Sequence, residues 1–224
     1  MFAGALLATA VVQDAGASAS SADSLDLAPL LESYNARVEG ALRDIDSLVV
    51  RQEMFEPQAD GSELRATAIL SYKSGEEMIR EVLSSDLAHP AGQYRLSSLV
   101  GPVLDEDEYV VRFEGVEEVG GHECYRLAVG AIARDADHFD GTVWVSTADA
   151  SPVRIVGEVA DPPFPVVWIH IDKTFERHAS GLWLLYRHTG EVEVSVLFVK
   201  KKGLRHIFYE DYEVGFARGR ELDY

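Results

Sequence analysis

Cys124 is the single cysteine of the chain, and His122 and Glu123 stand beside it in the stretch HECYRL. A nucleophilic cysteine needs a base within hydrogen-bond reach and an electropositive environment that lowers the pKa of its thiol. The stretch alternates as a β-strand does, so His122 and Cys124 share one face while Glu123 points to the other. Because the apolar residues fall on the side of Tyr125, we expect Cys124 on the more solvated face.

Acidic residues surround Cys124 in the sequence, with Glu117, Glu118 and Glu123 close by. Negative neighbours raise the pKa of a thiol and disfavour the thiolate. We therefore interpret Cys124 as a structural residue. The alternative is a reactive or intermolecular thiol, which an unpaired cysteine always leaves open.

Metal and cofactor chemistry would need residue clusters that the spacing does not supply. The histidines are scattered along the chain, at His89, His122, His138, His170, His178, His188 and His206. None pair at the H-x-x-x-H spacing of a helical metal site, and the stretch DADHFD at 135–140 has no defined ligand pattern. Glycine-rich phosphate loops and serine elbows are missing as well. The sequence therefore predicts no enzyme, no catalytic residue, no metal and no cofactor.

The charge composition of the chain excludes some classes of binding partner. The 224 residues include 38 acidic and 20 basic side chains, a formal net charge of -18. Such a charge repels phosphate backbones, so we expect no nucleic-acid partner. With 47% hydrophobic residues, the chain can bury one sizeable core, and a β domain of this length is often undivided.

The first residues, MFAGALLATAVV, form a short apolar run, and a stretch rich in alanine, serine and glycine follows. The run is too short to span a bilayer and resembles the end of a secretory signal, although it has no positive n-region. We expect residues 1–23 to be a signal-peptide remnant or a disordered tail, residues 24–216 a single domain, and 217–224 a C-terminal tail. The expected location is the periplasm, after secretion across the inner membrane.

One segment has helical periodicity. From Pro29 to about Asp46, apolar residues recur at spacings of three and four, and proline suits the first turn. The expected helix presents a stripe to the rest of the domain through Leu31, Tyr34, Val38 and Leu42.

Beyond Ser47 the hydrophobic period changes to two. Short segments of alternating residues, separated by turns such as Asp60-Gly61 and Gly120-Gly121, predict about ten strands. Short connections leave no room for crossover helices, so the sheet must be antiparallel. Residues 74–86 fit either a capped helix or a strand, and we favour the strand. Residues 88–102 are expected to be irregular, with room for one helical turn.

This pattern resembles the LolA-like periplasmic lipoprotein carriers, the outer-membrane lipoprotein-sorting family. The resemblance rests on the order of helix and strands and on the stretches YVVRFEGVEEVGGHECYRLAV, GTVWVSTADASPVRIVGEV and FYEDYEV. It implies a mainly β (α+β) fold, a curved, unclosed antiparallel half-barrel whose concave face is covered by the N-terminal helix. It also implies an arginine that locks this lid, for which Arg51, Arg65, Arg80 and Arg95 are candidates.

The apolar residues of each strand would line the concave face of such a sheet. The expected lining residues are Leu70, Val111, Phe113, Leu127, Val145, Ile155, Ile169, Ile171, Leu184, Val194, Val196 and Phe208. Trp144, Trp168 and Trp183 fall on the opposite faces of their strands. These side chains either enclose a cavity for acyl chains or interdigitate as a packed core.

The resemblance implies a monomeric, non-catalytic carrier that binds lipid or lipoprotein acyl chains, with lipoprotein sorting as the specific role. Envelope membrane proteins are a second class of expected partner. The alternative function is an envelope-sensing or protein-interaction module that uses the same scaffold without lipid transport.

Overall fold

The computed structural model describes residues 26–87, 94–196 and 199–217, and for Val196 and Val199 the backbone alone. The expected signal remnant or tail at residues 1–23, and residues 218–224 of the expected C-terminal tail, lie outside the described residues. No helix in the described ranges has the length and apolar character needed to cross a membrane.

Helix α1 spans Leu27–Asp44, two residues earlier than the sequence predicts at both ends. The carboxylate of Asp26 accepts a hydrogen bond from the backbone N–H of Ala28 and caps the helix, since the first N–H groups of a helix have no partner within it. Of the expected stripe, Tyr34 and Val38 are fully buried, whereas Leu31 and Leu42 are partly buried against the core.

Ten strands form one antiparallel sheet within the described residues, as predicted, including a strand at 79–85 and one helical turn, α2, before Gly101. The elements after α1 are β1 (Ile45–Pro57), β2 (Glu63–Lys73), β3 (Ile79–Ser85), α2 (Ser97–Val100), β4 (Tyr109–Val119), β5 (His122–Ala131), β6 (Phe139–Ser146), β7 (Pro152–Val159), β8 (Val166–Arg177), β9 (Trp183–Val196) and β10 (Val199–Phe216).

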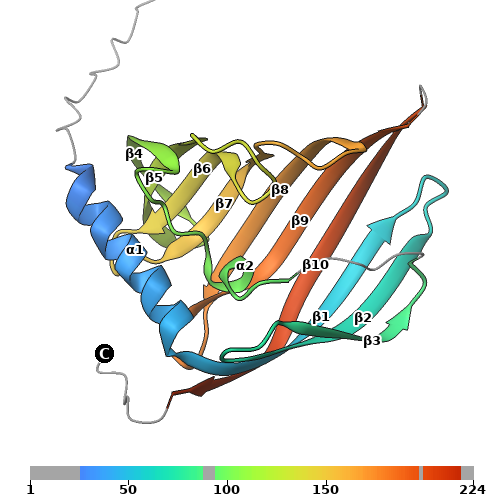
Figure 1. The fold of residues 1–224 in the computed structure, drawn as a ribbon, viewed down its shortest axis with the longest axis horizontal. Helices are drawn as coiled ribbons and strands as arrows, with labels where there is room; N and C mark the ends of the chain where they lie inside the picture. Colours follow the sequence, from blue (N-terminus) through green and yellow to red (C-terminus); the bar gives the residue numbers. More distant parts are fainter. Residues whose placement is uncertain (1–25, 88–93, 197–198, 218–224) are drawn as a thin grey trace, which may run out of the picture.

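The strand order explains how the interior is filled. The order is β3-β2-β1-β10-β9-β8-β7-β6-β5-β4, so β3 and β4, which are consecutive in the chain, form the two opposite edges of the open sheet. The connection between them, residues 86–108, must therefore cross the sheet from one edge to the other. Its described part from residue 94 to 108 lies on the concave side and carries α2, which packs against β9 (Figure 1).

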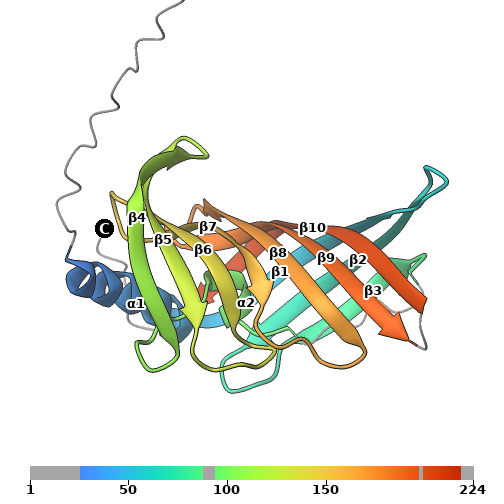
Figure 2. The same cartoon turned by 90° about the horizontal axis from the view of Figure 1, so that it is seen from above.

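The sheet is strongly curved, as the view from above shows (Figure 2). Two glycines pair where the curvature brings strands close: Gly141 of β6 and Gly157 of β7. A Cβ atom at Gly141 would overlap the backbone of Val156, and one at Gly157 would overlap that of Asp140. Only glycine permits this approach, since any side chain would force the two strands apart.

Helix α1 lies across one end of the concave side and covers only part of it (Figure 1). The hydroxyl of Tyr34 donates to the carbonyl of Pro102 at 3.0 Å. The amide of Asn35 donates to the carbonyl of Leu104 at 3.0 Å and accepts from its N–H at 2.8 Å. The helix is thus attached to the edge-to-edge connection, and the two together cover one half of the concave face.

Candidate functional site

The concave face has a packed half and an open half. In the half beneath α1 and α2, Leu70, Leu127 and Val145 are 0% exposed and Ile155 is 1% exposed. These expected lining residues form a core together with Leu99 of α2. Val111 and Phe113 of β4 also pack against this core, partly buried. Here the side chains form a packed core, because residues 94–108 fill the space over this half of the sheet.

The open half lies over the far ends of β8, β9 and β10. We call it the concave trough: a depression of about 240 Å³ lined by Ile169, Ile171, His188, Val192 and Ile207, with Gly190 and Gly203 on its floor. Ile169 and Ile171 are thus expected lining residues that the structure does bring together. Val194 continues this face of β9, half-buried, whereas the side chain of Val196 lies outside the described residues.

A second hollow continues the concave trough towards α2. We call it the inner cavity. Its volume is about 230 Å³, and its polar lining residues are Ser97, Ser98, Lys173, His188, His138 and the ion pair of Arg95 with Asp137. It shares Ile171 and His188 with the concave trough. Each hollow alone is smaller than the roughly 300 Å³ at which ligand pockets begin, whereas the sum of the two neighbouring volumes exceeds it.

The prediction that Phe208 lines the concave face is wrong. Its ring lies on the convex face, 5.7 Å from that of Phe55 and 6.3 Å from that of Tyr186. Its neighbours Ile207 and Tyr209 point to the concave side and are 8% and 4% exposed. Both faces of this segment carry large apolar residues, so alternation alone could not decide which one points inward.

The prediction that Leu184 lines the concave face and that Trp183 lies on the opposite face is also wrong. Trp183, expected on the opposite face, lies beside Val38 and Ala41 of α1 around a small cavity, and its indole N–H donates to Asp149 at 3.0 Å. Leu184 is buried, but it does not line the concave trough. A register shift between Thr174 and Phe175 inserts one extra residue in β9 and reverses the alternation before it. Such a bulge has no clear sequence signal.

The other two tryptophans lie on the convex face, as expected. The guanidinium of Arg154 stacks over Trp144 at 5.5 Å from the ring centroid, and the Trp144 indole N–H donates to Glu117. Trp168 stacks on His170, with 5.8 Å between the ring centroids. These rings pack on surface neighbours and do not line the trough.

Cys124 is fully buried, at 0% exposure, and not on a solvated face as the alternation predicted. The turn after β6 covers this end of β5, where the N–H of Thr147 donates to the carbonyl of Glu123. Burial, assisted by the charges of Glu117 and Glu123, raises the pKa of the Cys124 thiol to about 11. The thiol is therefore protonated at neutral pH and lacks the reactivity of a nucleophile.

We expect a disulfide reagent such as DTNB to leave Cys124 of the native protein unreacted at pH 8 and to label it at once in denaturant. Cys124→Ala should keep any acyl-chain affinity within about threefold, since the residue lies away from both hollows. Rapid labelling of the folded protein would contradict the structural role. So would a loss of binding at an unchanged melting temperature.

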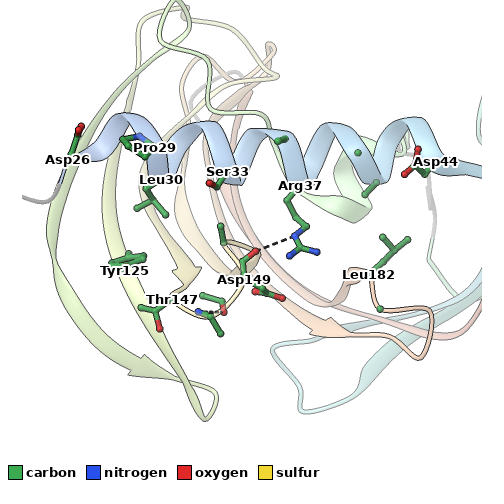
Figure 3. A pocket seen from close by; sticks show the side chains of 17 residues that line it. Asp26, Pro29, Leu30, Ser33, Arg37, Asp44, Tyr125, Thr147, Asp149 and Leu182 are labelled. Carbon is green, nitrogen blue, oxygen red and sulfur yellow. Dashed lines mark hydrogen bonds between the residues drawn. The ribbon is translucent and has the colours of Figure 1, made fainter. Parts of the chain in front are cut away.

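A large groove also runs beneath α1 (Figure 3). Its volume is about 800 Å³, and its walls are one side of α1, the turn 147–150 and Gly181-Leu182. Arg37 crosses it, and its Nε donates to the carbonyl of Asp149 at 3.2 Å. The groove mixes polar and apolar walls, unlike the apolar surface of the concave trough.

Of the four arginines proposed as a lid lock, Arg80 contacts the connection between β3 and β4, and Arg95 belongs to it. Arg80 of β3 donates from Nε to the buried Gln52 at 3.0 Å and stacks over the ring of Tyr94. Arg95 pairs with Asp137 at 3.0 Å. Arg51 and Arg65 instead pair with acidic residues of the sheet, Arg51 with Glu210 at 2.7 Å and Arg65 with Glu63 at 2.9 Å.

Sequence reasoning missed two polar residues: Lys173, which lines the inner cavity, and His188, which lines both the inner cavity and the concave trough. They are register partners on β8 and β9, on the concave face. The sequence of β8 contains a signal for Lys173. It belongs to the same alternating set as Ile169, Ile171 and Phe175, which are all apolar. Burial lowers the pKa of Lys173 to about 8. Burial first, and then the charge of Lys173, lower the pKa of His188 to about 3.

The depressed pKa of Lys173 predicts a pH effect on stability. Between about pH 8 and 10.5, the unfolded chain keeps this proton and the folded chain releases it, so stability rises with pH; below this window the buried charge destabilises the fold. Lys173→Met should therefore raise the free energy of unfolding at pH 7 by about 1–2 kcal/mol, less than the full shift because the side chain is only partly buried.

Urea unfolding of both proteins from pH 6 to 10.5 measures this effect. The difference between them should shrink as the pH rises through the window. A variant that is less stable than the wild type at pH 7 would show that Lys173 makes a favourable native contact and would contradict the prediction.

Comparisons with known proteins concern the fold. No protein-family model and no curated protein sequence matches the chain. Among solved structures, it is similar to a DUF1329 family protein from Desulfovibrio piger, at 12% identity over 86% of this chain and 95% of that one, with a TM-score of 0.48. It is also similar to an outer membrane lipoprotein-sorting protein domain from Vibrio parahaemolyticus, at 11% identity over 87% and 93%, with a TM-score of 0.47. A LolA superfamily protein from Nitrosomonas europaea has 14% identity over 87% and 94%, with a TM-score of 0.43. The solved structures to which this chain is similar include proteins named as a LolA superfamily member and as a lipoprotein-sorting domain.

Proposed function

We propose that the protein is a non-catalytic carrier that binds acyl chains in the concave trough. One observation carries this proposal: the covering elements α1 and α2 fill one half of the concave face and leave an apolar depression over β8–β10. Ile169, Ile171 and Val192 are only partly buried there, although they lie on the same concave face as the buried core residues. Apolar residues left uncovered on a concave face are the usual sign of a ligand site.

The energetics favour a chain-like ligand. Each methylene moved from water onto this surface contributes roughly 0.8 kcal/mol. Part of this gain is lost because the chain and the protein lose translational and rotational freedom. A chain of several methylenes still binds with a net gain. A small polar metabolite would find few free partners, because Glu56 and Arg205, two charged residues that also line the trough, pair with each other at 2.8 Å.

The direct test is mass spectrometry of organic extracts from the freshly purified protein, combined with displacement of a fluorescent fatty-acid probe. We expect a co-purifying acyl lipid and saturable probe binding that persists at high salt, because burial of apolar surface is not screened. A protein that carries no lipid and binds no acyl probe would end the carrier proposal.

A protein-interaction module is the second candidate function, and the edge strand β3 favours it. Ile79 is 62%, Leu83 58% and Val82 42% exposed, and β3 pairs with β2 alone among the described strands. An exposed strand edge with apolar side chains can accept a strand from another protein. Replacing Leu83 by lysine should weaken capture of an envelope partner and leave probe binding unchanged.

The proposed carrier works in the periplasm as a monomer and receives its cargo from envelope membrane proteins. The apolar run at the N-terminus and the net charge of -18 support this, since an acidic surface is repelled by anionic bilayers. Lipoprotein sorting is the specific role we propose. Fractionation of the native cell, with intact-mass measurement of the N-terminus, tests the location.

A further inference from the structure

Lys173 brings a positive charge into the apolar half of the concave face. It pairs in register with Ile155 of β7 and His188 of β9 and lines the inner cavity. No carboxylate within the described residues forms an ion pair with it. An unpaired charge in such a place costs folding free energy, so its presence calls for a compensating ligand or role.

The nearest acid in sequence does not compensate this charge. Asp172 points to the convex face, where its two carboxylate oxygens accept from Nε and an Nη of Arg154 at 3.0 and 2.8 Å. In a chain with a net charge of -18, the concave side of β8 thus keeps a cation without a counterion, because strand alternation sends the adjacent carboxylate to the other face.

His188 adds a second polar group without a partner. Its Nε2 atom is buried and makes no hydrogen bond to any of the described residues, and the residue lines both the concave trough and the inner cavity. With its lowered pKa the imidazole is neutral at pH 7, and the tautomer protonated on Nε2 offers one N–H donor. The hydroxyls of Ser97 and Ser98 line the same cavity from α2.

We propose that Lys173 and His188 bind the oxyanion head group of an amphiphile, a carboxylate or a phosphate monoester, whose acyl chain lies along the concave trough. This inference rests on the proposed carrier function and specifies its ligand class. Lys173 supplies a charge-assisted hydrogen bond, and His188 supplies a neutral one. In this arrangement the head lies in the inner cavity, which Lys173 and His188 line, and the chain lies in the neighbouring concave trough over Ile169, Ile171 and Val192.

The test compares ligands that share one chain and differ in the head. Laurate, dodecyl phosphate, dodecanol and inorganic phosphate are titrated into the full chain by calorimetry at pH 7, for the wild type, Lys173→Met and the surface control Lys201→Met. We expect the wild type to bind laurate or dodecyl phosphate at least about tenfold more tightly than dodecanol. Lys173→Met should lose most of this preference while keeping its dodecanol affinity, and Lys201→Met should behave as the wild type.

Equal binding of laurate, dodecyl phosphate and dodecanol by the wild type would overturn the head-group inference and leave the carrier proposal intact. Inorganic phosphate that binds as tightly as dodecyl phosphate would also overturn it, since the site would then serve a free anion. A wild type that binds none of the chain ligands ends the carrier proposal and this inference with it.

Discussion

Gly190→Leu should abolish acyl-chain binding without destabilising the protein. Gly190 lies on the floor of the concave trough in β9, and the nearest atom that a Cβ would meet is His188 Nε2 at 3.6 Å, an ordinary contact. The added side chain therefore fills the trough instead of distorting the strand. Leucine also loses less backbone entropy than glycine on folding, so the melting temperature should be unchanged or slightly higher. We expect probe affinity to fall by more than about tenfold.

The matched control is Glu158→Leu, which adds a similar side chain to the convex face of β7, where Glu158 is exposed. It should bind the probe as the wild type does. Gly190→Leu with wild-type affinity would show that chains bind elsewhere, for which the groove beneath α1 is the next candidate. Unfolding of Gly190→Leu would contradict the prediction, because the structure leaves space for the added side chain above Gly190.

Val145→Trp should cause the largest loss of stability. Val145 is 0% exposed on β6, between Tyr125 of β5 and Pro152 of β7. An indole has no room in this packed half, and overpacking costs about 1–3 kcal/mol even for smaller additions. We expect a loss of more than about 3 kcal/mol, a large fraction of the 5–15 kcal/mol by which domains are stable. Thermal and urea unfolding measure it.

Val110→Trp provides the comparison, since Val110 lies on the edge strand β4 and is 56% exposed. Its stability should stay within about 0.5 kcal/mol of the wild type. If Val145→Trp folded with near-native stability, the half of the concave face beneath α1 and α2 would have to open readily. The ligand site would then extend across the whole sheet.

The elements of this protein could be predicted from local patterns. The period of three and four from Leu30 to Leu42 indicated α1, and the period of two beyond Ser47 indicated ten strands. Short connections required an antiparallel sheet, because a parallel pair needs a long crossover. Lys173 also carried a readable signal, a charged residue at an apolar position of β8, and it was overlooked because single charges are common in strands.

The sequence by itself determined the helix, the strands and the face that most strand residues share, because these depend on neighbours only a few positions apart. Tertiary structure alone decided what covers each face. The bulge in β9 reversed Trp183 and Leu184, and the register with β1 and β9 placed Phe208 outside. The strand order placed residues 94–108 on the concave side. They pack one half around Leu99, and the described residues leave Ile169 and Val192 partly exposed in the other half. The alternation of side chains along a strand depends only on neighbouring residues. Which segments cover each face of the sheet depends on contacts between residues far apart in the chain, and the hydrophobic period does not predict those contacts.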